Sequence, residues 1–185
     1  MSHRPSFEIA IAGAGLIGLT LALELHSRGL SVAVIDAAQP MRGASVAAAG
    51  MLAANDPHNP AVLGPFARHS LSLYPAFLDR LSSLSGLPVP FQTELTIQFL
   101  SDGTSTLLPE RSVDPRQLAA AVLASARAVG ITILENTGYP TLIELPDHVR
   151  ILPQHGPELS AAQLVHASGA WFSGTPAIRP RKGQM

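Results

Sequence analysis

The start of the chain places short apolar runs between glycines. Residues 8–12 form a compact apolar run that ends at Gly13, a pattern typical of a buried parallel strand. Leu16 to Ser27 follows as a helical segment of leucines and alanines without proline, and Gly29 stands where a helix C-cap is expected. Residues 31–36 are rich in β-branched side chains and end on an acid. This order of strand, turn, helix and strand predicts a βαβ unit.

The middle of the chain changes its hydrophobic period twice. Small residues from Gln39 to Ala54 predict a loop. Apolar residues spaced three and four apart predict a helix from Val62 to Leu84, which Pro75 should kink or divide into two shorter helices. Residues 87–108 carry strand-like segments, of which Thr93 to Phe99 is the clearest.

The rest of the chain repeats the order of helix, glycine and strand seen at its beginning. Asp114 is suited to an N-cap and Pro115 to the first helical position, and the apolar period then continues to Gly130. Residues 131–135 predict a strand that joins the same sheet. Short antiparallel strands are expected at 141–145 and 148–152, and a final strand at 163–167. The fold class that follows is α/β, with a Rossmann-type domain and a parallel sheet.

Composition narrows the function classes. The 185 residues carry 12 Lys and Arg and 13 Asp and Glu, and the net charge is -1. This balance gives none of the excess of positive charge that binding to nucleic acid requires. Cysteine is absent, which excludes disulfides and thiolate chemistry, and the seven histidines show no metal spacing. The apolar runs are far shorter than the roughly 20 residues that cross a bilayer, and no secretory leader is evident. We expect a soluble cytoplasmic protein without a metal, membrane or nucleic-acid partner.

The glycine turn carries the strongest chemical signal. Residues 13–18 (Gly13, Ala14, Gly15, Leu16, Ile17, Gly18) match GxGxxG after a strand and before a helix, and Asp36 lies 18 residues beyond the last glycine. Such a turn lets a pyrophosphate approach the backbone at the helix N-terminus, and the acid accepts the ribose hydroxyls. Asp36 would repel a 2′-phosphate, so NADP is disfavoured. The alternative is an ordinary α/β turn with chance glycines.

Residues 43–51 form a second unusual stretch, almost entirely glycine, alanine and serine. Such a segment lets the backbone approach a flat ligand with its N–H groups free to donate. It is equally compatible with a small-residue helix that packs tightly on the sheet. His69, within the predicted helix, is expected to be a polar-face or hydrogen-bonded core residue and not a metal ligand.

These features together resemble the FAD-dependent amino-acid oxidase superfamily, most closely the glycine oxidase family of thiamine biosynthesis. Further stretches follow the family's order along the whole chain. They are Arg68-His69-Ser70 with Tyr74, residues 84–87, residues 113–118, residues 167–171 and residues 180–184.

The resemblance implies FAD contacts residue by residue. Leu16 and Ile17 would present N–H groups to the pyrophosphate, and Asp36 with Ala37 would hold the adenosine ribose. Pro140 would meet the adenine. The remaining implied contacts lie along the phosphates and ribityl chain (Ala44, Ser45), against the flavin ring (Ala49, Gly50, Met51) and at the end of the last strand (Ser168, Gly169).

The same resemblance implies a function and a domain plan. Residues 1–185 would be a FAD-binding domain, apparently truncated, in which residues 87–112 are a remnant of a shortened antiparallel substrate domain. The activity would be oxidation of the CH–NH bond of glycine or a small amine or amino acid, with oxygen as acceptor. No residue corresponds to a catalytic position of the family, and the chain alone is expected to be inactive. A homo-oligomer is compatible with the sequence.

Two alternatives stay open at this point. An NAD-dependent dehydrogenase would explain the glycine turn but leaves residues 43–51 without a role. The second alternative is a truncated, inactive fragment that binds FAD or another dinucleotide.

Overall fold

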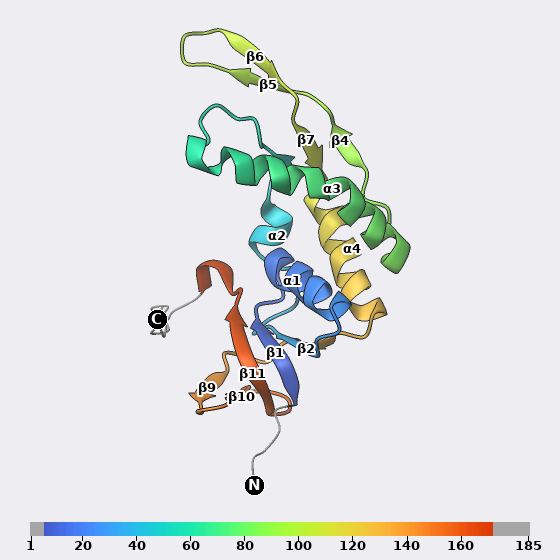
Figure 1. Cartoon of the computed structure of the whole chain (residues 1–185), viewed down its shortest axis with the longest axis vertical. Coiled ribbons are helices and arrows are strands. Elements are labelled where there is room, and N and C mark those ends of the chain that lie inside the picture. Colours follow the sequence, from blue (N-terminus) through green and yellow to red (C-terminus); the bar gives the residue numbers. More distant parts are fainter. Residues whose placement is uncertain (1–5, 172–185) are drawn as a thin grey trace, which may run out of the picture.

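A six-stranded sheet lies at the base of the protein (Figure 1). The computed structural model describes residues 6–171. The pairs formed by β8, β2, β1 and β11 are parallel, whereas β10 pairs antiparallel with both of its neighbours, β11 and β9. In spatial order the strands are β8 (Thr132–Leu134), β2 (Val32–Ile35), β1 (Phe7–Ala12), β11 (Leu159–His166), β10 (Val149–Leu152) and β9 (Thr141–Glu144).

The central strand β1 is buried from both sides. Ala10 and Ile11 point to opposite faces of the sheet, and neither is exposed to solvent. The first strand therefore lacks the polar alternation of a half-exposed strand, because layers cover both of its faces.

Three helices share a core on one side of the sheet: α1 (Leu16–Ser27) contacts β1 and β2, α4 (Pro115–Ala128) packs against α1, and α3 (Gly64–Ser85) packs against α4. Figure 1 shows them stacked on the same side of the sheet. Helix α4 begins as predicted, because the carboxylate of Asp114 accepts the backbone N–H groups of Arg116 and Gln117 at 2.8 and 3.4 Å. Leu19, Leu81 and Val122, one from each helix, are fully buried in this layer.

A smaller core lies on the opposite face of the sheet. Ala10 and Ile35 meet Ile151, Leu159 and Ala161 there, and all five are buried. The buried residues of this core come from β1, β2, β10 and β11, and the antiparallel pairing of β9 with β10 confirms the predicted short antiparallel pair.

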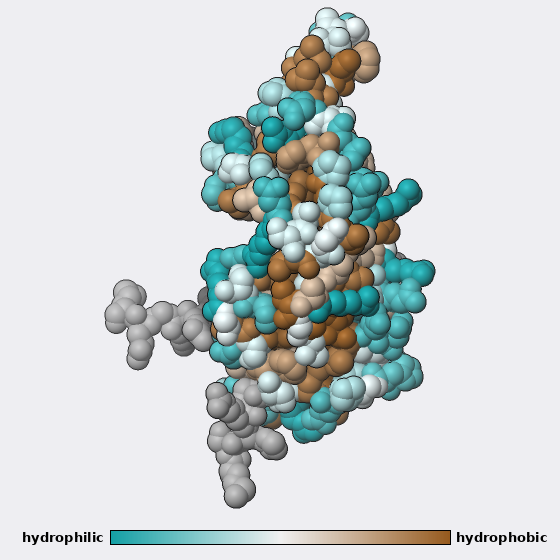
Figure 2. Space-filling model, turned by 90° about the vertical axis from the view of Figure 1, so that its right-hand side faces the viewer, coloured by the Kyte–Doolittle hydropathy of each residue, from teal (hydrophilic) through white to brown (hydrophobic). Residues whose placement is uncertain are grey.

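The remaining strands form two separate small sheets. One contains β3 (Met51–Leu52), β7 (Arg111–Val113) and β4 (Phe91–Thr93). The other is the hairpin of β5 (Thr96–Phe99) and β6 (Ser105–Leu108), which projects at the end of the molecule far from the main sheet (Figure 1). Hydrophobic side chains are exposed at this projecting end (Figure 2), where Ile97, Phe99 and Leu107 are more than half exposed.

Three predictions about local structure need correction. The predicted loop of residues 39–54 contains the one-turn helix α2 (Ala44–Ala47) and strand β3, whose partner β7 was not predicted. Helix α3 runs through Pro75 as one helix, so of the two predicted outcomes the division into two shorter helices is wrong; the 3-10 turn η1 (Ala61–Leu63) precedes it. Tertiary packing explains its continuity, because Leu78 and Leu81 anchor the turns that follow the proline.

Strand β11 begins at Leu159, four residues before the predicted start, because its first part pairs with β10 and its remainder with β1. The short turn η2 (Gly169–Trp171) follows it. Residues 180–184, one of the stretches behind the family resemblance, lie outside the described residues. Within residues 6–171, none of the helices is long and apolar enough to cross a membrane.

Candidate functional site

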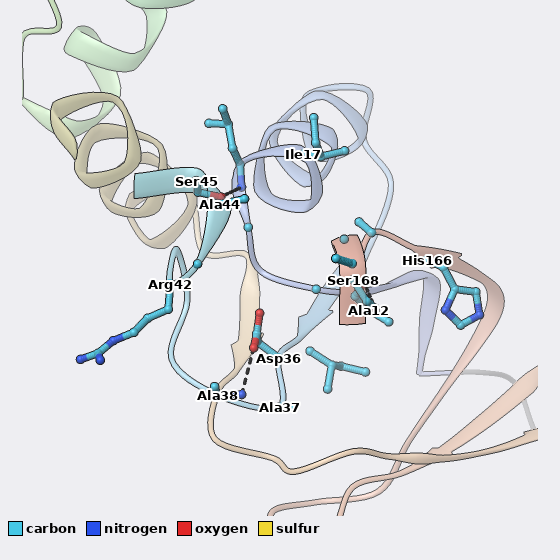
Figure 3. Close-up of a pocket in the computed structure, with 18 of the residues that line it drawn as sticks. Ala12, Ile17, Asp36, Ala37, Ala38, Arg42, Ala44, Ser45, His166 and Ser168 are labelled. Atoms are coloured by element: carbon cyan, nitrogen blue, oxygen red, sulfur yellow. Dashed lines mark hydrogen bonds between the residues drawn. The ribbon is translucent and has the colours of Figure 1, made fainter. Parts of the chain in front are cut away.

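A cavity of about 1470 Å³ opens where β1, β2 and β11 end (Figure 3). The last residues of these strands, Ala12, Ile35 and His166, line it. Helices α1 and α2, the residues after β2 and the β9–β10 hairpin close its other sides. Its volume exceeds the roughly 300–1,000 Å³ of ordinary small-molecule pockets, so it can hold an elongated ligand of dinucleotide size.

The glycine turn between β1 and α1 leaves no room for side chains. Gly13 has φ +112°, and a Cβ atom there would overlap the backbone carbonyl of Ala167. A Cβ on Gly18 would overlap the carbonyl of Gly13 itself. Two of the three motif glycines are therefore required by close packing of β1, α1 and the end of β11. This turn directs the start of α1 toward the cavity, and Gly15 and Leu16 line it.

Asp36 connects the turn to the loop that follows β2. Its Oδ2 accepts the backbone N–H of Ala14 at 2.7 Å. Its Oδ1 accepts the backbone N–H of Ala38 at 2.9 Å, as Figure 3 shows. A carboxylate offers about four acceptor positions, so each oxygen can still accept one more hydrogen bond. Because Asp36 lines the cavity, these free positions suit the two hydroxyls of a ribose.

The first turn of α1 has a partner from another part of the chain. Gly15 is its N-cap and offers no capping side chain, so the first N–H groups lack a local acceptor. The hydroxyl of Ser45, in α2, accepts the N–H of Leu16 at 2.9 Å. The segment of residues 43–51 is thus neither a plain loop nor a helix packed tightly on the sheet, because α2 contains no buried residue and faces the start of α1.

Most of the predicted cofactor contacts come together in this cavity. Thirteen of the sixteen residues line it: Gly13, Gly15, Leu16, Ile17, Asp36, Ala37, Ala44, Ser45, Gly50, Met51, Pro140, Ser168 and Gly169.

Three predicted residues do not line the cavity. Ala14 is buried and acts through its backbone N–H on Asp36, and Gly18 packs against Gly13. Ala49 lies outside, and its neighbour Ala48 lines the cavity instead. The chain leaves α2 in an extended conformation at Ala48, so the side chains of consecutive residues point in different directions there.

Several lining residues were not predicted to have a role. Tyr74 reaches the cavity from α3 and is half-buried, and desolvation raises the pKa of its phenol. Glu144 and His166 come from the β9–β11 side, and Tyr139 lines the cavity beside Pro140, the residue predicted to meet the adenine. Arg42 precedes the small-residue stretch, and its position beside that stretch was the available signal. Among the described residues, no cluster of three His, Asp or Glu side chains could hold a metal ion.

Known proteins with similar sequences are FAD-dependent oxidoreductases and glycine oxidases. The sequence profile of the DAO family, described as FAD dependent oxidoreductase, matches residues 8–108. A glycine oxidase of Geobacillus kaustophilus (strain HTA426) is 37% identical over 90 residues, which cover 48% of this chain and 23% of that protein. A bifunctional protein ThiO/ThiG of Trichormus variabilis is 26% identical over 219 residues, covering 96% of this chain and 33% of the relative.

Solved structures show the same fold. The crystal structure of glycine oxidase from Geobacillus kaustophilus superposes with a TM-score of 0.80 at 24% identity, covering 91% of this chain and 56% of that one. Iminodiacetate oxidase from Chelativorans sp. BNC1 gives 0.70 at 19% identity, with 89% and 56% covered. The predicted α/β fold is confirmed. The matched part of the chain spans 23% and 33% of the length of these curated relatives and 56% of the solved glycine oxidase.

Proposed function

This chain belongs to the DAO family of FAD-dependent oxidoreductases, and from that premise we propose that it oxidises the CH–NH bond of a small amine or amino acid, with dioxygen as acceptor. In the balanced reaction the amine loses two electrons and two protons to become an imine, and dioxygen gains them to become hydrogen peroxide. The family's cofactor, FAD, supplies this two-electron chemistry when it is bound.

The cavity fits an ADP-containing cofactor, and the observation that carries the proposal is the contact of Gly13 with Ala167. No side chain fits at Gly13, and the residues of the turn and the start of α1, Gly13, Gly15 and Leu16, line the cavity. We propose that this turn and the first N–H groups of α1, that of Ile17 included and that of Leu16 only when it leaves Ser45, hold the pyrophosphate, and that Asp36 and Ala37 hold the adenosine ribose.

The remaining predicted contacts follow along the same cavity. Ala44 and Ser45 would lie along the phosphates and ribityl chain, and Gly50 and Met51 against the flavin ring. Pro140 would meet the adenine, and the turn at 168–169 would pass close to the cofactor. In the domain plan that we propose, residues 1–185 form a FAD-binding domain in which residues 87–112, apart from the main sheet, belong to a substrate domain.

The substrate class rests on the relatives. The matched proteins are named for oxidation of glycine and of iminodiacetate, both of which are small amines carrying carboxylates. We infer that this protein acts on glycine or a comparable small amine. Because the chain spans only part of each relative, we propose this activity for the whole protein.

Two measurements test the proposal separately. Binding is measured by titrating FAD, NAD and NADP while following thermal unfolding, and FAD should give the largest rise in melting temperature. Peroxide release is measured with the complete reading-frame product, excess FAD and glycine, sarcosine or D-alanine, with L-glutamate as a control. A larger shift with NAD than with FAD would overturn the cofactor assignment. FAD binding without peroxide from any of the three amines would overturn the substrate assignment alone.

A further inference from the structure

The cavity lining is poor in positive charge. Among the described residues that line it, Asp36 and Glu144 carry full negative charges and Arg42 carries the one permanent positive charge. A dinucleotide brings a pyrophosphate with two negative charges into this lining. The N-terminus of α1 contributes the equivalent of about half a positive charge, which leaves most of the phosphate charge without a counter-charge.

Part of that helix terminus is already engaged. The N–H of Leu16 donates to the hydroxyl of Ser45 at 2.9 Å, so it is not free to bind a phosphate while this bond exists. A side-chain cation at the same end of the cavity would supply what the backbone does not. Arg42 is placed there, between Gln39 and Gly43, which also line the cavity.

The backbone that carries Arg42 is fixed to the glycine turn. Met41, the preceding residue, has φ +61°, a left-handed conformation that is uncommon outside glycine. Its N–H donates to the carbonyl of Ala14 at 2.9 Å, and its side chain is buried. A non-glycine residue is held in this conformation only when its surroundings determine it, and such residues concentrate at ligand sites. The start of the Arg42 side chain is therefore anchored beside the turn.

The guanidinium of Arg42 is free, unlike those of most other arginines. Arg28, Arg80, Arg111, Arg127 and Arg150 each form an ion pair with a glutamate. Arg42 is exposed, and within residues 6–171 it forms no side-chain hydrogen bond or ion pair. Figure 3 shows it extending from the loop between β2 and α2, away from Asp36. Its fork of N–H donors matches two phosphate oxygens, which Lys cannot do.

We propose that Arg42 is a positioning residue for the dinucleotide, whose side chain folds over the pyrophosphate and supplies its counter-charge. The proposal rests on the proposed function, since it requires a cofactor with an ADP half. It extends that function because it assigns charge neutralisation to the loop after β2 and not to the glycine turn alone.

The test compares Arg42→Gln with Arg116→Gln. Arg116 is also an exposed arginine, its side chain forms no ion pair within the described part of the chain, and it does not line the cavity. Dissociation constants for FAD and for ADP are measured at low and high salt by flavin fluorescence and by competition. Arg42→Gln should weaken both ligands about 10- to 100-fold at low salt, because a charge-assisted pair is lost. Arg116→Gln should change neither.

The salt dependence gives a second readout. FAD affinity of the unchanged protein should fall more steeply with salt than that of Arg42→Gln, because an exposed ion pair is screened. Arg42→Lys should recover the salt slope but only part of the affinity, because the bidentate geometry is missing. If the unchanged protein binds FAD and Arg42→Gln matches it in affinity and slope, the role of Arg42 is wrong and the cofactor assignment stands. If the unchanged protein binds neither FAD nor ADP, both proposals fall.

Discussion

The hydroxyl oxygen of Ser45 accepts a hydrogen bond of 2.9 Å from the backbone N–H of Leu16. The two residues are 29 positions apart, and the bond joins α2 to the first turn of α1. A helix start without its own capping side chain is thereby completed by another segment. We propose that the cofactor's phosphates bind beside this hydrogen bond, so Ser45 has a structural role independent of any ligand.

Ser45→Ala should therefore have two effects. Loss of a partly buried hydrogen bond should lower the free energy of unfolding by about 0.5–1.5 kcal/mol, measured by urea denaturation without ligand. FAD should also bind more weakly to the variant. Ser83→Ala is the control, because its hydroxyl donates to the carbonyl of Asp79 at an exposed position of α3. Equal stability of Ser45→Ala and Ser83→Ala would contradict a capping role.

Asp36→Ala should reduce FAD affinity and stability together. The carboxylate accepts two backbone N–H groups, and we expect it to accept ribose hydroxyls as well. A hydrogen bond to a charged acceptor contributes about 1.5–3 kcal/mol, so the dissociation constant should rise at least tenfold in a fluorescence titration. Asp79→Ala, on the exposed face of α3, should leave both quantities unchanged. Unchanged affinity in Asp36→Ala would show that the ribose is held elsewhere.

Gly13→Ala should destabilise the protein far more than Gly29→Ala. Both glycines have positive φ, +112° and +85°, so an alanine is strained at either position. A methyl group at Gly13 would also overlap the carbonyl of Ala167, whereas the space at Gly29 is open. We expect a loss of about 1 kcal/mol at Gly29 and roughly 3 kcal/mol or more at Gly13. Similar denaturation midpoints for the two variants would show that β11 can move away from the turn.

The β5–β6 hairpin should drive self-association of this chain. Ile97 and Phe99 are 58% and 79% exposed on the projecting hairpin, and apolar side chains gathered at one exposed end favour contact with another molecule. Size-exclusion chromatography should show species larger than a monomer. The double substitution Ile97→Ser and Phe99→Ser should shift the protein toward the monomer. An unchanged elution volume would place the contact on another surface.

The 185-residue chain by itself should bind FAD without producing peroxide. A carboxylate substrate must be held by a cation close to the flavin, since misplacement by about 1 Å can slow a reaction on the order of 100-fold. Arg42 is the one arginine among the described lining residues, and we assign it to the ADP half. The measurement is peroxide release with glycine and excess FAD. Steady turnover by the purified chain would show that another part of it holds the substrate.

The sequence predicted the elements whose signals are local. The helix from Leu16 to Ser27 has the bounds that the pattern indicated, and Asp114 caps α4 as expected. The glycine motif also indicated the cofactor class, because its requirements act within one turn of chain. These features depend on side-chain periodicity, capping chemistry and glycine conformation, all of which are set by residues a few positions apart.

Only the tertiary structure decided which residues meet. The hydroxyl of Ser45 accepts the N–H of Leu16, and Ala48 lines the cavity in place of Ala49. Both contacts exist because α2 packs against α4 beside the start of α1, which the periodicity of so short a segment does not determine. Likewise Gly13 is confined by Ala167, more than 150 residues later, through the pairing of β1 with β11. Such contacts depend on how sheet and helices pack, and the spacing of residues along the chain does not contain that information.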